Sequence, residues 1–157
     1  MVRIGIGHDT HRTLPGGPLK LGGIEIPADF HLDGHSDADA LLHAITDALL
    51  GAAGLADIGD LFPDTDPLHK GRDSTSMLQA ALALVRGKGY EIGNVDCIVF
   101  AQKPKLTLYK SSIRARVARI LGITEEQVGI KAKTGEGVGE IGRGEIVSTQ
   151  CVVLLIL

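Results

Sequence analysis

The stretch that decides the fold is Gly5-Ile6-Gly7-His8-Asp9-Thr10-His11-Arg12. It continues an alternation of apolar residues that includes Ile4, and this alternation predicts a first strand over residues 2–7. We expect the polar residues after Gly7 to lie in the loop that leaves the end of this strand. There, a carboxylate and an imidazole two positions apart, Asp9 and His11, could occupy two corners of a divalent metal site.

The composition indicates one globular domain spanning residues 1–157, long enough to enclose a real core. Apolar residues make up 44% and aromatic residues only 3%, so we expect a core of Leu, Ile, Val and Ala. The formal net charge of −3 argues against a nucleic-acid partner, which would require a basic surface. An acidic chain that handles phosphates needs metal ions or helix N-termini to supply positive charge.

The two cysteines, Cys97 and Cys151, lie in apolar runs without a nearby Cys or His, so we expect reduced, buried thiols rather than a disulfide or a zinc pair. We find no signal-peptide pattern before the first strand and no apolar run long enough to span a bilayer. These features predict a cytoplasmic protein that does not contact a membrane.

The first half of the chain predicts a hairpin, a helix and two loops. Alternating residues over 19–27 surround Gly22-Gly23, which is typical of a hairpin. A polar loop is expected over 28–35, and Ser36 with Asp39 then resembles a capping box. A helix should follow to about residues 51–54, with Ala38, Leu41, Leu42, Ile45 and Leu49 as its apolar stripe. Residues 55–72 contain two prolines and several acids, which argue against any regular element.

The second half alternates less regularly between helices and strands. The patterns predict helices over 74–86 and 106–121, a short capped turn at 124–127, and strands over 94–100, 128–133 and 146–156. Loops are expected at 101–105 and at the glycine-rich segment 134–144. Strands and helices are therefore mixed without strict alternation, which favours an α+β fold over a doubly wound sheet.

His43 is the third candidate metal ligand. On a helical wheel it lies away from the apolar stripe, so we do not expect it in the core. Asp39 and Asp47 flank it at i−4 and i+4, and either could accept a hydrogen bond from the ring nitrogen that does not bind metal. One carboxylate and two imidazoles suit zinc with an open fourth position. An ordinary exposed histidine explains the spacing equally well.

Four further polar clusters each allow a bland and a functional interpretation. His35 precedes a helix N-terminus that could bind an anion, whereas helix capping alone explains Ser36 and Asp37. The acidic residues of 57–66 could be a solvated turn or could accept hydrogen bonds from sugar hydroxyls. Residues 101–107 could be a charged turn, or a rigid loop whose backbone reads a base while Lys105 approaches a phosphate. In 133–137, free backbone N–H groups and Thr134 could hold phosphate oxygens, with Glu136 binding Mg²⁺.

Taken together, these segments closely resemble the 2-C-methyl-D-erythritol 2,4-cyclodiphosphate synthase family. The resemblance extends from Arg3 to the C-terminal strand and rests on separated motifs in a fixed order. The motifs are Gly7-His8-Asp9-Thr10-His11, Gly34-His35-Ser36-Asp37-Ala38-Asp39, Leu42-His43-Ala44-Ile45-Thr46-Asp47-Ala48-Leu49-Leu50-Gly51, Asp57-Ile58-Gly59, Leu61-Phe62-Pro63-Asp64-Thr65-Asp66, Gly93-Asn94-Val95-Asp96, Ala101-Gln102-x-Pro104-Lys105 and Gly142-Arg143-Gly144-Glu145.

The resemblance implies a phosphorus–oxygen lyase of the non-mevalonate isoprenoid pathway. Its substrate would be 4-diphosphocytidyl-2-C-methyl-D-erythritol 2-phosphate, whose 2-phosphate attacks the β-phosphorus, releases CMP and closes a cyclic diphosphate. Catalysis would then rest on positioning and charge neutralisation rather than on a protein nucleophile. The implied fold is a single-domain subunit with a mixed sheet covered by helices on one face. Three subunits would pack their sheets around a three-fold axis, with the active sites between neighbours.

The resemblance also implies roles for individual residues. Asp9, His11 and His43 match the zinc ligands, and Glu136 matches the residue that holds Mg²⁺ or Mn²⁺ between phosphates. His35 would stabilise the transition state, and Thr134 would orient the diphosphate. The residues expected to contact substrate are Asp9, His11, His35, Ser36, Asp57, Ile58, Gly59, Phe62, Pro63, Asp64, Thr65, Asp66, Ala101, Gln102, Lys103, Pro104, Lys105, Leu106, Thr107, Lys133, Thr134, Gly135, Glu136 and Arg143.

Three positions depart from the family pattern. Lys133 stands where many members have threonine, and Gly135 stands where a hydroxyl residue is common. Glu140 replaces an aromatic residue that faces the central channel in some members, and an acid there would repel an isoprenoid diphosphate.

Two other functions fit parts of the pattern. A zinc phosphoesterase would use a metal-activated water and release inorganic phosphate, but it leaves the loop containing Pro104 and Lys105 without a role. A non-catalytic nucleotide-binding trimer would bind cytidine nucleotides without turnover.

Overall fold

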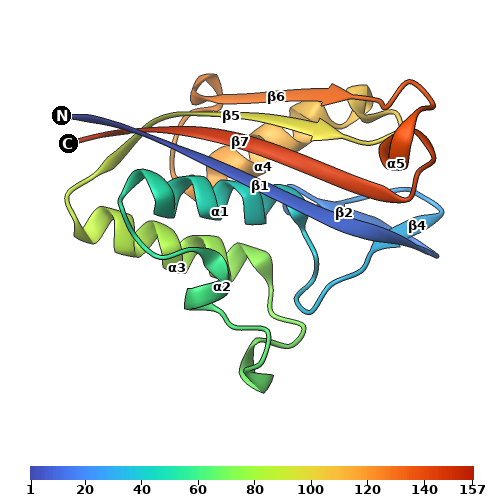
Figure 1. Ribbon diagram of the computed structural model, residues 1–157. Coiled ribbons are helices and arrows are strands. Elements are labelled where there is room, and N and C mark those ends of the chain that lie inside the picture. Colours follow the sequence, from blue (N-terminus) through green and yellow to red (C-terminus); the bar gives the residue numbers. More distant parts are fainter.

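The computed structural model describes residues 1–157 and contains a five-stranded sheet in the order β4-β1-β7-β5-β6 (Figure 1). The pair β5–β6 is parallel, and all other neighbours in this sheet are antiparallel. The strands are β1 Val2–Pro15, β4 Phe30–Leu32, β5 Glu91–Phe100, β6 Val128–Lys133 and β7 Ile146–Ile156. The predicted hairpin is confirmed as a separate pair, β2 Leu19–Leu21 with β3 Ile24–Ile26, joined by Gly22 and Gly23 at φ 64° and 77°.

The helices cover one face of the sheet, as predicted (Figure 1). Helix α1, Ala40–Ala52, packs on β1 and β7, α3, Ser74–Gly87, packs on α1, and α4, Lys110–Leu121, packs on β6. The short helices are α2 Ile58–Leu61, α5 Gly139–Gly142 and the 3-10 turns η1 Pro67–His69, η2 Leu106–Leu108 and η3 Glu125–Gln127. The fold is therefore α+β with one continuous core between sheet and helices.

Helix α1 lies directly on the backbone of β1. A Cβ atom added to Gly7 would come within 1.8 Å of the Ala44 carbonyl oxygen, and one added to Gly5 within 2.0 Å of the Ala48 carbonyl oxygen. Only glycine allows this approach, because any side chain would collide with helix backbone rather than with a flexible group. The contact brings His43 on α1 close to the end of β1 that carries Asp9 and His11.

The prediction that Asp9 and His11 lie in a loop was wrong. Strand β1 continues to Pro15, and its pairing with β7 runs without interruption through His11↔Val147 and Arg12↔Ile146. The long apolar strand β7 pairs with β1 beyond Gly7, so residues whose own pattern does not predict a strand are held in one. Asp9 and His11 therefore point to the same face of a rigid strand, since alternate residues share a face.

Four other local predictions were also wrong. The glycine-rich segment 134–144, expected as a loop, contains the short helix α5. Part of the expected loop 28–35 is strand β4, which pairs with the end of β1. The N-cap of α1 is Asp39, whose side chain accepts from Leu42 N, rather than Ser36, because Ala38 adopts φ 56° and breaks the turn between them. The acidic segment 55–72 forms α2 and η1, since Asp57 and Asp66 cap these short turns.

The cysteine prediction is confirmed. Cys97 on β5 and Cys151 on β7 are paired across the sheet, both buried and both free, with their sulfur atoms 3.3 Å apart. The hydrogen bond with Cys97 and burial together raise the pKa of the Cys151 thiol well above its usual value. A thiol held protonated in this way is a poor nucleophile.

The second face of the sheet carries exposed apolar side chains. Ile4 and Ile6 on β1 are 70% and 69% exposed, and Val152 and Ile156 on β7 are also exposed. No helix covers this face in the subunit. A contiguous apolar surface of this kind on a sheet is typical of an interface with another protein surface.

Candidate metal centre and lysine pocket

Asp9, His11 and His43 form one cluster of potential metal ligands, as predicted. Asp9 Oδ2 lies 2.8 Å from His11 Nε2 and 3.0 Å from His43 Nδ1, and the three ligand atoms lie within 4.8 Å of one another. Two residues come from β1 and one from α1, so the close contact of these elements at Gly7 assembles the cluster.

The outer ring nitrogens of both histidines have partners of their own. His11 Nδ1 donates to the Asp33 carbonyl oxygen at 2.7 Å, so Nε2, which donates to Asp9 while it is protonated, can offer its lone pair to a metal once that proton leaves. His43 Nε2 lies 2.8 Å from Ser74 Oγ and 3.1 Å from Ser36 Oγ, so that Nδ1 can present its lone pair to the same point. One carboxylate and two imidazole lone pairs that converge in this way fit a cation such as zinc, with a fourth position open.

Two expectations about His43 were wrong. It is only 9% exposed, because α1 is covered on nearly all sides and its polar face is not solvated. Neither flanking carboxylate bonds its ring. Asp39 accepts from the backbone of Gly22 and Gly23, and Asp47 accepts from Ile58 N.

The charges of the cluster reinforce one another. Burial alone would raise the pKa of Asp9, but the hydrogen bonds and charges of His11 and His43 outweigh it and lower the pKa from 3.8 to about 2. Burial likewise disfavours protonated His11, yet Asp9 and the Asp33 carbonyl raise its pKa above 6.5. Asp9 is therefore ionised over the whole physiological pH range. His11 keeps its proton to a higher pH than an ordinary histidine does.

Zinc affinity is accordingly expected to decrease as the pH falls from about 8 towards 6, because the proton on His11 competes with the metal above the ordinary imidazole pKa of about 6.5. The metal-free protein has the opposite preference. Its Asp9–His11 pair stabilises the fold most between 3.8 and 6.5, losing the Asp9 contribution below this window and the His11 contribution above it. Chelator-competition titrations at several pH values test the predicted fall in zinc affinity. An affinity that does not change with pH would contradict it.

The cluster forms one side of a hollow of about 230 Å³, here called the metal pocket. Its lining residues are Asp9, His11, Gly34, His35, Ser36, His43, Ile58, Gly59, Phe62, Asp64, His69 and Met77. His35 Nε2 is buried there without any hydrogen-bond partner. An unpaired buried nitrogen beside a metal cluster indicates that a polar ligand completes the site.

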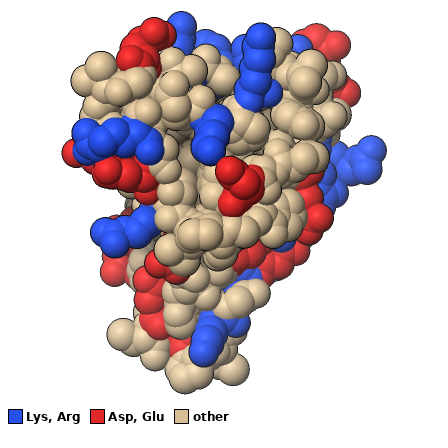
Figure 2. Space-filling model, turned by 90° about the vertical axis from the view of Figure 1, so that its right-hand side faces the viewer, with Lys and Arg blue, Asp and Glu red and all other residues tan.

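A second hollow, here called the lysine pocket, has a volume of about 480 Å³. Its lining residues are Ala101, Gln102, Lys103, Pro104, Lys105, Leu106, Thr107, Ala132, Lys133 and Thr134. The two predicted segments 101–107 and 133–134 thus meet, because β5 and β6 are parallel neighbours and end side by side. Figure 2 shows several Lys and Arg side chains on the upper part of the face that contains this end of the sheet.

The glycine-rich loop after β6 is organised around Gln102. The side-chain oxygen of Gln102 accepts from Gly135 N and Gly137 N at 3.2 and 3.3 Å, while Thr134 Oγ1 donates to Glu136 Oε1. A Cβ atom on Gly135 would lie 2.4 Å from Gly142 N, which explains why this chain has no hydroxyl residue there. The prediction of free backbone donors here was wrong, because the N–H groups of Gly135 and Gly137 bond Gln102 and that of Glu136 bonds Thr134. Thr134 itself lines the lysine pocket.

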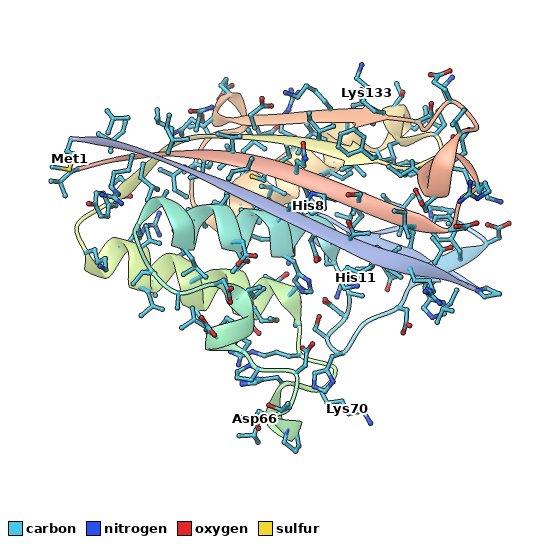
Figure 3. The ribbon with its side chains drawn as sticks, in the orientation of Figure 1. Met1, His8, His11, Asp66, Lys70 and Lys133 are labelled. Carbon is cyan, nitrogen blue, oxygen red and sulfur yellow. The ribbon has the colours of Figure 1, made fainter.

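The structure does not bring the two pockets together within one subunit, since they share no lining residue. His11 lies on the side of β1 that faces the loop with Asp66 and Lys70, whereas Lys133 lies at the far side of the sheet (Figure 3). Several predicted site residues line neither pocket: Asp57, Pro63, Thr65, Asp66, Gly135, Glu136 and Arg143. Among them, Asp57 and Asp66 cap helical turns, and Arg143 pairs with Glu145 at 2.7 Å.

Four residues at or beside the metal pocket were not predicted. Gly34, His69 and Met77 line it, and Ser74 contacts His43. His69 also receives a hydrogen bond from Arg72, whose guanidinium lies 4.6 Å from the Phe62 ring centroid. No spacing in the sequence points to Ser74 or Met77, because their contacts arise only when α3 packs beside α1.

Comparisons with known proteins agree with this geometry. The sequence model of the YgbB family matches residues 2–156. The 2-C-methyl-D-erythritol 2,4-cyclodiphosphate synthase of Rhodopirellula baltica is 54% identical over 153 residues, covering 98% of this chain and 92% of that one. The enzyme of the same name from Halalkalibacterium halodurans is 51% identical and covers 99% of both chains. A solved cyclodiphosphate synthase with CDP bound superposes with a TM-score of 0.91 at 39% identity, covering 98% of this chain and 100% of that one.

The mixed sheet, the metal-ligand cluster and the polar pockets define a metal-binding α+β enzyme. The chain belongs to the YgbB family. Many of its curated relatives carry the name of the cyclodiphosphate synthase that the sequence motifs resemble. None of its helices is long and apolar enough to cross a membrane.

Proposed function

We propose that the chain, as one domain of residues 1–157, converts 4-diphosphocytidyl-2-C-methyl-D-erythritol 2-phosphate to 2-C-methyl-D-erythritol 2,4-cyclodiphosphate and CMP. This is the lyase step of non-mevalonate isoprenoid biosynthesis. The observation that carries the proposal is the convergence of Asp9, His11 and His43 beside the unpaired nitrogen of His35. Family membership and relatives named for this reaction support it. The cytoplasmic location stays a prediction.

The residues divide into groups that hold the two ends of the substrate. Asp9, His11 and His43 would hold zinc, which when bound supplies Lewis-acid polarisation of a phosphate oxygen. His35, which lines the metal pocket together with Ser36, would contact a phosphate oxygen there. Phe62 and Asp64 flank the same hollow, next to Ile58 and Gly59, where the methylerythritol portion would lie.

The lysine pocket would take the cytidine end. Backbone groups of 101–107 would read the base, and Lys105 and Lys133 would neutralise phosphate charge at its rim. Thr134 would orient the diphosphate, and Glu136 would hold Mg²⁺ or Mn²⁺ between phosphates. A relative of 39% identity has been solved with CDP bound, which supports a cytidine nucleotide as ligand.

We further propose that the protein is a homotrimer whose active sites lie between subunits. The two pockets lie apart in one subunit, so a substrate held at both ends requires the metal pocket of one subunit and the lysine pocket of its neighbour. The exposed Ile4 and Ile6 would then be buried at the three-fold interface.

Replacing Ile6 with glutamate is expected to convert the trimer to monomers and to reduce turnover by at least about 100-fold, because a carboxylate would be desolvated at the interface and composite sites would be lost. Sedimentation velocity measures the assembly. The matched control is Leu84→Glu on α3, an exposed apolar residue on the helical side. A trimeric Ile6→Glu protein would contradict the placement of the interface.

The function itself is tested by ³¹P NMR of the protein with its proposed substrate, zinc and magnesium. CMP together with two coupled phosphorus resonances of a cyclic diphosphate is the expected result. Release of inorganic phosphate would instead indicate a zinc phosphoesterase. Binding of CDP without any reaction would indicate a nucleotide-binding protein. Lys133 and Gly135, which depart from the family pattern, would then be the first residues to replace with those that the family commonly has.

A further inference from the structure

A chain of hydrogen bonds runs from the back of His43 to the surface of β2. Ser74 Oγ lies 2.8 Å from His43 Nε2 and also bonds Asp37 Oδ1. Asp37 Oδ2 lies 2.7 Å from Lys20 Nζ. Ser74 is fully buried, the Asp37 side chain is 15% exposed and Lys20 is 36% exposed, so solvent contact increases steadily away from the metal cluster.

The partners of Asp37 determine the direction of these bonds. Oδ2 accepts from both Lys20 Nζ and the backbone N–H of Ser74, at 2.7 and 3.1 Å. Burial favours the neutral acid, but the bonds from Lys20 and Ser74 prevail and lower the pKa of Asp37. An ionised carboxylate can only accept, so the Ser74 hydroxyl must donate to Oδ1. The Ser74 oxygen is then free to accept the proton of His43 Nε2.

Ser74 is better suited to this role than Ser36, although both hydroxyls approach His43. Ser36 lies farther away, at 3.1 Å, accepts from Ala38 N, and lines the metal pocket without a carboxylate behind it. The Ser74 hydroxyl is not needed to cap α3, because the side chain of Asp73 performs that task by accepting from Thr75 N.

We propose that Lys20, Asp37 and Ser74 form a positioning relay that stabilises the proton of His43 on Nε2, in competition with Asp9, which accepts at Nδ1. The relay thereby orients the ring and makes the Nδ1 lone pair available to the metal. The relay rests on the proposed metal centre. Of the three residues, only Ser74 contacts a proposed metal ligand, His43, and none of them lines the metal pocket. Partners of this kind fix the tautomer of a ligating histidine and raise its affinity for the ion.

The substitution Asp37→Asn tests the direction of the relay with almost no change in shape. At the Oδ2 position Lys20 Nζ and Ser74 N donate at 2.7 and 3.1 Å, whereas the backbone donor at Oδ1, Asp39 N, is more distant at 3.3 Å. The amide oxygen is therefore expected at the Oδ2 position, with the NH₂ group facing Ser74 Oγ. Ser74 would then accept from the amide and donate to His43 Nε2, which forces the proton to Nδ1 and blocks the metal lone pair. Asp73→Asn is the matched control, since that carboxylate also lies near Lys20 but does not bond the Ser74 hydroxyl.

The tautomer is read directly from metal-free protein labelled with ¹⁵N-histidine, at a pH well above the ordinary imidazole pKa of about 6.5. Because Asp9 accepts at Nδ1 and Ser74 at Nε2, long-range ¹H–¹⁵N correlation should show a larger share of the Nε2-protonated form of His43 in the wild type and in Asp73→Asn than in Asp37→Asn. Identical His43 spectra in the wild type and Asp37→Asn would overturn the relay.

Zinc affinity, measured by chelator competition, tests the consequence. Asp37→Asn and Ser74→Ala are each expected to weaken binding by about 10- to 100-fold. Ser74→Thr keeps the hydroxyl and should stay within a few-fold of the wild type. Unchanged affinity in Asp37→Asn would overturn the positioning role. If the wild type bound no zinc while the tautomer shifted as described, the relay would stand and the metal assignment of the proposed function would fall.

Discussion

Replacing His43 with alanine is expected to abolish stoichiometric zinc binding and to reduce turnover by about 1,000-fold, because a Lewis acid contributes several kcal/mol to the transition state and each 1.36 kcal/mol is a factor of ten. Only Asp9 and His11 would remain as ligands, and neither nearby serine can replace an imidazole nitrogen. Metal analysis of the purified protein and the ³¹P assay measure the two effects.

The fold should survive this change. Alanine is the best helix former, and the Ser74 hydroxyl keeps its bond to Asp37 when the ring is gone. Circular dichroism and the oligomeric state report on folding. His31→Ala is the matched control, since His31 is an exposed histidine whose ring contacts only the Gly16 carbonyl. A His43→Ala protein with normal zinc content and normal rate would refute the metal assignment.

Among the glycine-to-alanine substitutions, Gly7→Ala should reduce the free energy of unfolding most, by about 3 kcal/mol, because overpacking against rigid backbone is strongly destabilising. The new Cβ would lie 1.8 Å from the Ala44 carbonyl oxygen, so α1 would have to move away from β1. His43 would move with it, and zinc affinity should fall together with stability. Urea denaturation of the metal-free protein separates the first effect from the second.

Gly51→Ala is the control for helix α1. Nothing lies within 4 Å of a Cβ at Gly51, and alanine is favoured over glycine in a helix by about 1 kcal/mol, so this variant should be slightly more stable than the wild type. If Gly7→Ala proved as stable as Gly51→Ala, the backbone contact between α1 and β1 would not be as close as described.

Elements with a strong local pattern could be predicted from the sequence. Helix α3, strands β6 and β7, and the capped turn at Thr124 and Gln127 follow the expected residues closely. Their periodicity, glycine stops and capping residues all agree, so packing did not have to override local preference. Strand β1 after Gly7 could not be predicted, because its conformation comes from the ladder with β7 rather than from its own alternation.

The candidate site was predictable only as a set of ligands. Residue types and spacing indicated Asp9, His11 and His43, which the structure brings together. Their supporting partners were mispredicted, because Asp47 and Asp39 are near His43 in sequence while Ser74 reaches it only through packing of α3 on α1. Sequence neighbours on a helix were therefore a poor guide to the contacts of a ring that points off the helix.

The position of Asp9 and His11 inside a paired strand has a consequence for how the protein can vary. A strand has a period of two, so inserting one residue between Gly7 and Asp9 would send both ligands to the opposite face of the sheet, among Ile4 and Ile6. The segment 55–72 contains no strand, so its side chains do not alternate between two faces. A change in its length need not move the residues of the metal cluster. We therefore expect a change of length in 55–72 to leave the metal cluster in place, and a one-residue insertion in the strand that carries Asp9 and His11 to destroy it.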